Sequence, residues 1–156
     1  MKILLAVDGS QRSLHETRFA LQLVQDGLNA SFVLANVQEP ASLYEIVASS
    51  GSTERIAKAA KGAGQGLLAP SAQMLKEAGV PYERVVVTGD PAQAIVELVE
   101  EHGCDMVLLG TRALGPLARA LEGGSTALRL LHNCPVPVLL VTPAQEWEAE
   151  GAAEDK

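Results

Sequence analysis

The chain has 156 residues, of which 47% are hydrophobic and 20% are charged. This length suits one domain, and this balance excludes a disordered or a fibrous chain. Aromatic residues make up only 3%, and the net charge of −7 leaves no basic stripe, so the composition argues against binding to nucleic acid or to an anionic membrane.

Targeting signals are weak in this sequence. The apolar run Ile3–Val7 is too short for the core of a signal peptide, and no stretch approaches the roughly 20 apolar residues of a membrane span. The two cysteines, Cys104 and Cys134, lie far apart without C-x-x-C spacing, which favours unpaired thiols in a reducing compartment. The sequence therefore predicts a cytoplasmic protein.

Five short apolar runs indicate buried strands. They are residues 2–7, 31–37, 82–87, 105–109 and 136–142. The first run ends in the turn signal Asp8-Gly9-Ser10, and a helix is predicted after it. Ser10 or Ser13 can cap this helix, and Ser13 with Glu16 has the spacing of a capping box. The expected buried face consists of Leu14, Leu21, Val24 and Leu28.

The second helix is less regular. We expect a loop from Pro40 to about Ser52, after which residues 53–61 have a helical pattern. Three glycines and Pro70 interrupt the pattern before residues 71–78 resume it. Because glycine and proline are both unfavourable inside helices, we expect a break or kink between the two segments.

The third helix begins with a clear signal. Asp90, Pro91 and Gln93 have the spacing of an N-cap, a first-turn proline and a capping-box partner. Its predicted inner face is Ile95, Leu98, Val99 and His102. After the fourth strand we expect a loop over residues 110–124, which contains four glycines, and then a short helix over residues 125–132.

Helices that alternate with unbroken apolar strands indicate an α/β domain, with an open five-stranded parallel sheet covered by helices on both faces. In such a sheet, ligands bind beyond the carboxyl ends of the strands, where the strand order reverses. The residues at these ends are Asp8, Val37, Asp90 and the loop that starts at Gly110. The sequence therefore places a candidate site there.

The loop after the fourth strand has features of an anion site. Glycines allow close approach of the backbone, and Gly124-Ser125-Thr126 opens a helix whose free N–H groups and hydroxyls could donate to a phosphate. Alternatively, Ser125 or Thr126 is only an N-cap and the glycines only shape the loop. Asp8 could accept a hydrogen bond from an adenine amine or a ribose hydroxyl, or it could simply close a turn.

Four segments together resemble the universal stress protein family. They are Ile3 to Ser10, Gly89-Asp90-Pro91, Val107 to Arg112, and Gly124 to Val141. The likeness covers residues 2–142, so we expect a universal stress protein domain over residues 1–142 and a disordered acidic tail over residues 143–156. The resemblance implies a Rossmann-like fold that is usually a homodimer, with members divided between ATP binders and non-binders.

The chain departs from the pattern of the ATP binders, which is glycine, two residues, glycine, nine residues, then glycine and Ser/Thr. Gly110 matches the first glycine, but Ala113 stands at the second, and Gly124 comes one residue late. An insertion in the loop, with Gly115 as a substitute glycine, would explain both departures. A side chain at residue 113 is tolerated only if its φ is negative.

The resemblance also implies roles for particular residues. Ala6, Asp8 and Val37 would hold the adenine end of the ligand, and Leu109 and Gly110 would hold the ribose. Gly115, Gly124, Ser125 and Thr126 would bind the phosphates. Arg112 and Arg119 are the cations of the loop, where they either add positive charge to the site or remain solvated on the surface.

The leading hypothesis is a stress-response regulatory protein that binds ATP or AMP, with or without Mg²⁺, and does not turn it over efficiently. The sequence contains no P-loop signature and no G-x-S-x-G motif, and its histidines have no carboxylate at ligand spacing. No residue stands out as a general base, which favours binding over catalysis.

Two alternatives remain open. The protein could be a slow ATPase or an autophosphorylating protein. It could instead be a dimer that has lost nucleotide binding and docks to another protein. The apolar run Val136–Val141 would leave unpaired backbone groups at a sheet edge, which predicts a homodimer through this strand.

Overall fold

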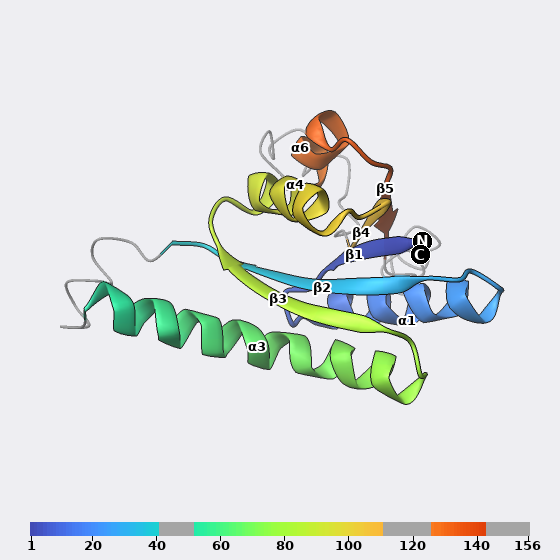
Figure 1. The fold of residues 1–156 in the computed structure, drawn as a ribbon, viewed down its shortest axis with the longest axis horizontal. Helices are drawn as coiled ribbons and strands as arrows, with labels where there is room; N and C mark the ends of the chain where they lie inside the picture. Colours follow the sequence, from blue (N-terminus) through green and yellow to red (C-terminus); the bar gives the residue numbers. More distant parts are fainter. Residues whose placement is uncertain (41–51, 111–125, 143–156) are drawn as a thin grey trace, which may run out of the picture.

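The computed structural model describes residues 1–40, 52–110 and 126–142. Within these residues, five parallel strands form one sheet in the order β3-β2-β1-β4-β5 (Figure 1). The strands are β1 (Lys2–Ala6), β2 (Ser31–Gln38), β3 (Tyr82–Thr88), β4 (Met106–Gly110) and β5 (Val138–Val141). The predicted fold, an open five-stranded parallel sheet of the α/β class, is confirmed.

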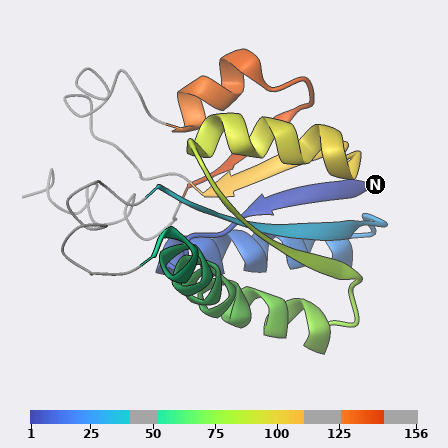
Figure 2. The same cartoon turned by 60° about the vertical axis from the view of Figure 1, so that its left-hand side comes forward.

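The helices cover both faces of the sheet (Figure 2). One face packs against α1 (Gln11–Gln25) and α3 (Thr53–Glu77), and the other against α4 (Pro91–His102) and α6 (Thr126–Asn133). Alternate residues of β1 enter the two cores: Ile3 and Leu5 lie on the α1 and α3 side, and Leu4 lies on the other side. Burial on both faces explains why the strands are apolar throughout.

The strand order reverses between β1 and β4. From β1 the chain adds β2 and β3 on one side, whereas β4 pairs with the other side of β1 and β5 follows it. The register aligns Ala6 of β1 with Leu109 of β4, so the carboxyl ends of these two strands lie together. We call this place the β1–β4 switch point; it is where ligands bind in sheets of this kind.

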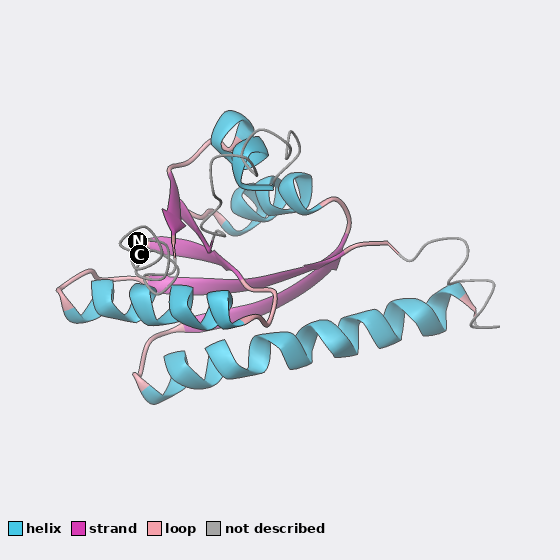
Figure 3. Ribbon diagram, turned by 180° about the vertical axis from the view of Figure 1, so that it is seen from behind, coloured by secondary structure: helices cyan, strands magenta, loops and turns pink. Residues whose placement is uncertain are grey.

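Helix α3 is one continuous helix of 25 residues, so the predicted break is wrong (Figure 3). Gly64 lies where the helix crosses the sheet, and a Cβ at this position would come within 2.5 Å of Val86 Cγ1. Leu68, Ala72 and Leu75 are completely buried. Packing against the sheet therefore outweighs the unfavourable local effect of the glycines and the proline.

Helix α1 also differs from the prediction. Its N-cap is Ser10, which accepts the N–H of Ser13, and Glu16 takes no part in a capping box. The expected apolar face is only half-buried, while the fully buried residues are Ser13, Glu16, Thr17 and Ala20. A hydrogen bond of 2.8 Å between Thr17 Oγ1 and Ser71 Oγ of α3 satisfies part of this buried polar surface. The predicted face is therefore correct in part: Leu21, Val24 and Leu28 pack at the edge of the core, but the most deeply buried residues of α1 are mainly polar.

The N-terminus of α4 follows the prediction in part. Asp90 is the N-cap and accepts the N–H of Gln93 at 3.1 Å, and Pro91 occupies the first turn. The side chain of Gln93 bonds Glu97 instead of completing a capping box. Asp90 also accepts two hydrogen bonds of 2.7 Å from Arg129, which join α4 to α6 across the surface.

The inner face of α4 is close to the prediction. Ile95, Leu98 and Val99 are buried against the sheet. His102 instead lies at the rim of the core, where its Nδ1 is 3.1 Å from Glu83 Oε1 of β3. None of the helices in the described ranges is both long enough and apolar enough to cross a bilayer.

Candidate functional site

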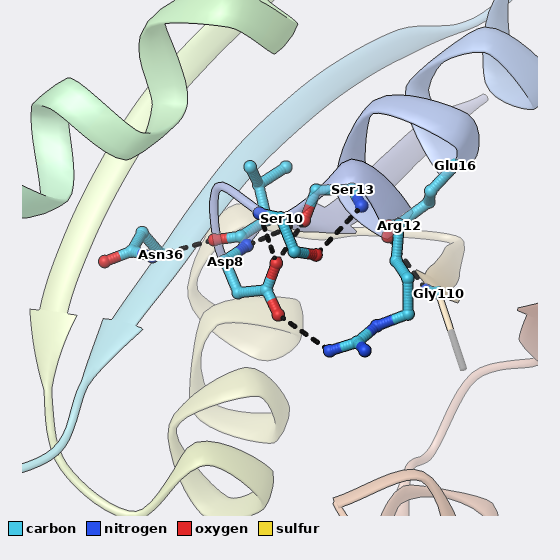
Figure 4. Close-up of polar contacts among 8 residues, drawn as sticks. Asp8, Ser10, Arg12, Ser13, Glu16, Asn36 and Gly110 are labelled. Carbon is cyan, nitrogen blue, oxygen red and sulfur yellow. Dashed lines mark hydrogen bonds and ion pairs between the residues drawn. The ribbon is translucent and has the colours of Figure 1, made fainter. Parts of the chain in front are cut away.

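The turn after β1 places Asp8 at the β1–β4 switch point (Figure 4). Its Oδ1 accepts the N–H of Ser10 at 2.9 Å and the hydroxyl of Ser13 at 2.6 Å. The N–H of Asp8 in turn donates to Ser13 Oγ, and Arg12 Nη2 lies 3.6 Å from Asp8 Oδ2. Gly9 turns the chain at φ +80°, and a Cβ there would come within 2.5 Å of an α3 side chain.

Asp8 is held as a carboxylate. Partial burial acts to raise the pKa of Asp8, but hydrogen bonds from Ser10 and Ser13 and the charge of Arg12 outweigh it and lower that pKa below its usual value. Both of these hydrogen bonds are made to Oδ1, which supports the alternative that Asp8 closes the turn. Because the side chain remains 61% exposed, its other oxygen can still accept from a ligand.

Glu16 reaches from α1 to the end of β4 and contacts Gly110. The side chain is only 1% exposed, and its Oε2 accepts the N–H of Gly110 at 2.8 Å. Its Oε1 is buried and has no hydrogen-bond partner in the part of the chain that the structure describes. The N–H of Gly110 is therefore already used inside the protein and is not free for a ligand.

Burial controls the charge of Glu16. Desolvation raises the pKa of this carboxyl well above its usual value. The hydrogen bond from the N–H of Gly110 lowers that pKa by less, and the negative charge of Asp8 raises it slightly further. The switch point thus carries two carboxyl groups whose pKa values shift in opposite directions, the exposed one downward and the buried one upward.

Three of the predicted site residues share one face of the sheet. Ala6, Val37 and Leu109 are half-buried at the carboxyl ends of β1, β2 and β4, and all three pack on the core that lies under α4 and α6. Glu16 lies on the opposite side, on α1. The structure therefore brings an apolar surface and the Asp8 turn to the same edge of the sheet.

Asn36 belongs to this edge, although the sequence analysis did not select it. It is 3% exposed, and its Nδ2 donates to the carbonyl of Val7 at 2.7 Å. This bond ties the end of β2 to the end of β1. The available signal was a polar residue inside an otherwise apolar strand, since a buried amide in such a place needs a partner.

Several predicted residues cannot be placed. Arg112, Gly115, Gly124 and Ser125 lie outside the described residues, as do Arg119 and the predicted acidic tail. Thr126 is the first residue of α6 and is half-buried. Within the described ranges, no group of three or more His, Cys, Asp and Glu side chains is placed to hold a metal ion.

An open parallel sheet with polar groups at its switch point defines the class of α/β proteins that bind a ligand at the strand ends. The model of the universal stress protein family matches residues 1–142. The chain is also 32% identical over 140 residues to the universal stress protein MJ0531 of Methanocaldococcus jannaschii, a match that covers 90% of this chain and 81% of the relative. The chain belongs to the universal stress protein family.

Solved structures agree with the fold. A universal stress protein family protein from Arabidopsis thaliana, solved with AMP bound, has a TM-score of 0.65 and 20% identity, with 94% of each chain covered. A universal stress protein in complex with cAMP has a TM-score of 0.61 and 24% identity, with 90% of this chain and 95% of that chain covered. At such identities the likeness concerns the fold.

Proposed function

We propose that this protein binds an adenine nucleotide, ATP or AMP, at the carboxyl ends of β1, β2 and β4 and acts as a cytoplasmic regulator in the stress response. The observation that carries this proposal is the meeting of the Asp8 carboxylate with three half-buried apolar residues at one sheet edge. The fold relatives that hold AMP and cAMP support it. Cys104 and Cys134 are free thiols, which suits a reducing compartment.

The ligand would lie across the switch point. The base would pack on Ala6 and Val37, with its amine donating to Asp8, and the ribose would lie against Leu109 and Gly110. Because the N–H of Gly110 is donated to Glu16, Gly110 would contact the ribose through its carbonyl oxygen.

The phosphates would extend toward the loop after β4. The residues proposed to hold them are Arg112, Gly115, Gly124, Ser125 and Thr126. Thr126 opens α6, whose first N–H groups and helix dipole favour an anion. Mg²⁺ enters the proposal only as a counter-ion that arrives with ATP.

We further propose that binding occurs without efficient turnover. A general base must reach the attacking water while it is ionised. Asp8 is bonded to its own turn, and Glu16 is buried against the backbone of Gly110, so neither of the carboxyl groups described at the switch point is suited to this role. A time course with labelled ATP tests this point: phosphate release above the level of a Ser125→Ala variant would contradict it.

Nucleotide analysis of the purified protein is the direct test of binding. Heat denaturation should release ATP or AMP, and added nucleotide should raise the melting temperature, since a ligand at 100 times its Kd stabilises by about 2.7 kcal/mol. If the purified protein contains no nucleotide, and millimolar ATP or AMP does not raise its melting temperature, the result would favour a dimer that docks to another protein and has lost nucleotide binding.

A matched pair of glycine variants tests the placement of the phosphates. Gly124→Val should weaken nucleotide binding at least about tenfold, because the side chain would occupy phosphate space and glycine is what lets a backbone approach an anion. Gly62→Val is the control, since a Cβ at this exposed helical glycine meets nothing within 4 Å. Equal affinity of both variants and the parent would show that the phosphate assignment is wrong.

We also propose a homodimer that forms through β5 and the residues before it, Val136–Val141. The described sheet ends at β5 on one side, and three of the four residues of this strand are half-buried. The edge on the other side is β3, where Glu83 and Arg84 are exposed. Charged residues on an edge discourage pairing, so β5 is the better candidate for an interface.

A further inference from the structure

Glu16 is a buried carboxyl group with only one hydrogen bond in the described structure. Its Oε2 accepts from the N–H of Gly110, while Oε1 is buried and unpartnered. A Cβ at Gly110 would lie 3.0 Å from Oε2, so the carboxyl group is packed directly against this part of the backbone. An ionised carboxylate has about four acceptor sites, and one N–H donor leaves most of them unsatisfied without water.

Among the described residues, no cationic side chain forms an ion pair with Glu16. Arg12, one turn earlier on α1, pairs with Asp8, and Asp8 itself is negative. Among the described elements, β4 and α3 both pack against α1. No residue of β4 is ionisable, and the buried residues of α3 are Gly64, Leu68, Ser71, Ala72 and Leu75. In the described structure these surroundings therefore favour the neutral acid of Glu16 over the carboxylate.

This charge state matters for an anionic ligand. A nucleotide at the ends of β1 and β4 would add negative charge beside the Asp8 carboxylate. Neutral Glu16 adds no repulsion, whereas ionised Glu16 would place a second negative charge near the bound anion. Ligand binding and ionisation of Glu16 therefore oppose each other, and linkage makes the effect reciprocal.

We propose that Glu16 is a positioning residue that holds the end of β4 as a neutral carboxylic acid and couples nucleotide binding at the β1–β4 switch point to one proton from solvent. The proton stays on Glu16 in the bound state at pH values at which the free protein has released it. This inference rests on the proposed nucleotide binding, and it adds that a proton regulates the affinity.

The test compares the Kd for ATP of the wild type with that of Glu16→Gln between pH 5 and pH 9. The glutamine keeps an oxygen that can accept the N–H of Gly110 but cannot ionise. Over this range the wild-type Kd should rise by about tenfold more than that of the variant, which corresponds to a difference of one pKa unit between the free and bound states. Titration of the ATP phosphates is common to both proteins and cancels.

Two controls accompany this comparison. Glu100→Gln makes the same substitution at an exposed position on α4, on the other face of the sheet, and should follow the wild type. Adenosine has no phosphate charge, so its Kd should show little difference in pH dependence between the wild type and Glu16→Gln. Circular dichroism establishes that each variant is folded.

The outcomes separate the inference from the proposed function. Parallel pH profiles for the wild type and Glu16→Gln would overturn the coupling while leaving nucleotide binding intact. A folded wild type that binds neither ATP nor AMP at any pH would overturn both. If Glu16→Gln does not fold, calorimetric titration of the wild type in two buffers of different ionisation enthalpy counts the protons directly, and the absence of proton uptake throughout this pH range would overturn the coupling.

Discussion

Asp8 and Glu16 show how environment sets the charge of two similar side chains. Asp8 lies in an exposed turn that donates hydrogen bonds to it, and it stays ionised. Glu16 is buried with one described donor, and desolvation raises its pKa well above the usual value. Local sequence predicted the turn around Asp8, because its partners lie within five residues. It could not predict the role of Glu16, because Gly110 lies 94 positions away.

Burial of Glu16 predicts a pH dependence of stability in the absence of ligand. Its folded pKa lies above the usual 4.5, so the folded protein holds a proton that the unfolded chain releases. The free energy of unfolding should therefore fall as the pH rises from about 4.5 to the folded pKa, and this contribution should be flat above it. Denaturant titrations of the wild type and Glu16→Gln measure the effect, and superimposable pH dependences would contradict it.

The position of Asp8 at the switch point leads to a prediction about adenosine binding. Asp8→Ala should weaken adenosine recognition by about 1–3 kcal/mol, the usual effect of removing one partner of a buried hydrogen bond. Asp8→Asn is the matched variant, because its side-chain oxygen can still accept from Ser10 and Ser13 and so preserve the turn. Calorimetric titration with adenosine compares them, and parental affinity in both variants would remove Asp8 from the site.

At the scale of elements, the sequence predicted where most helices and strands lie but not how α1 and α3 pack. Hydrophobic periodicity favoured the leucine face of α1, although polar residues of that helix are buried against α3 and β4. Glycine and proline indicated a break in α3, although Gly64 is what allows the close approach of this helix to β3. Both errors arise because local preferences are small compared with the free energy of tertiary packing.

Two glycines of α3 should respond in opposite directions to the same substitution. Gly64→Ala should destabilise the fold by about 1–3 kcal/mol, because the new methyl group would overpack against Val86 and Asn36. Gly62→Ala should stabilise it by about 1 kcal/mol, since its Cβ meets nothing and alanine favours the helix. Thermal unfolding of both variants checks the prediction, and a stabilising Gly64→Ala would contradict the close approach.

Pro70 offers another test of the continuous helix. It is exposed inside α3 and leaves one backbone hydrogen bond unmade. Pro70→Ala should therefore stabilise the protein by about 1–3 kcal/mol without reducing its helical content. Denaturant unfolding followed by circular dichroism measures this change. A loss of stability would mean that the chain breaks at this proline, as the sequence pattern alone had suggested.

At the scale of the whole molecule, the exposed edge of β5 predicts self-association. Sedimentation equilibrium should give the mass of a dimer, because pairing across a two-fold axis would satisfy backbone groups that β5 leaves unpaired. Leu140→Lys should shift the protein toward the monomer while circular dichroism remains unchanged. A monomeric wild type at micromolar concentration would refute the proposed interface.

The sequence by itself determined the α/β class, the resemblance to the universal stress protein family and the general position of the site. These depend on features that neighbouring residues share, such as apolar runs, turn residues and glycine spacing. Only the tertiary structure decided which face of α1 is buried, that α3 is continuous, and that Glu16 meets Gly110. Those outcomes depend on contacts between distant segments, which appear only when the sheet brings the ends of β1 and β4 together.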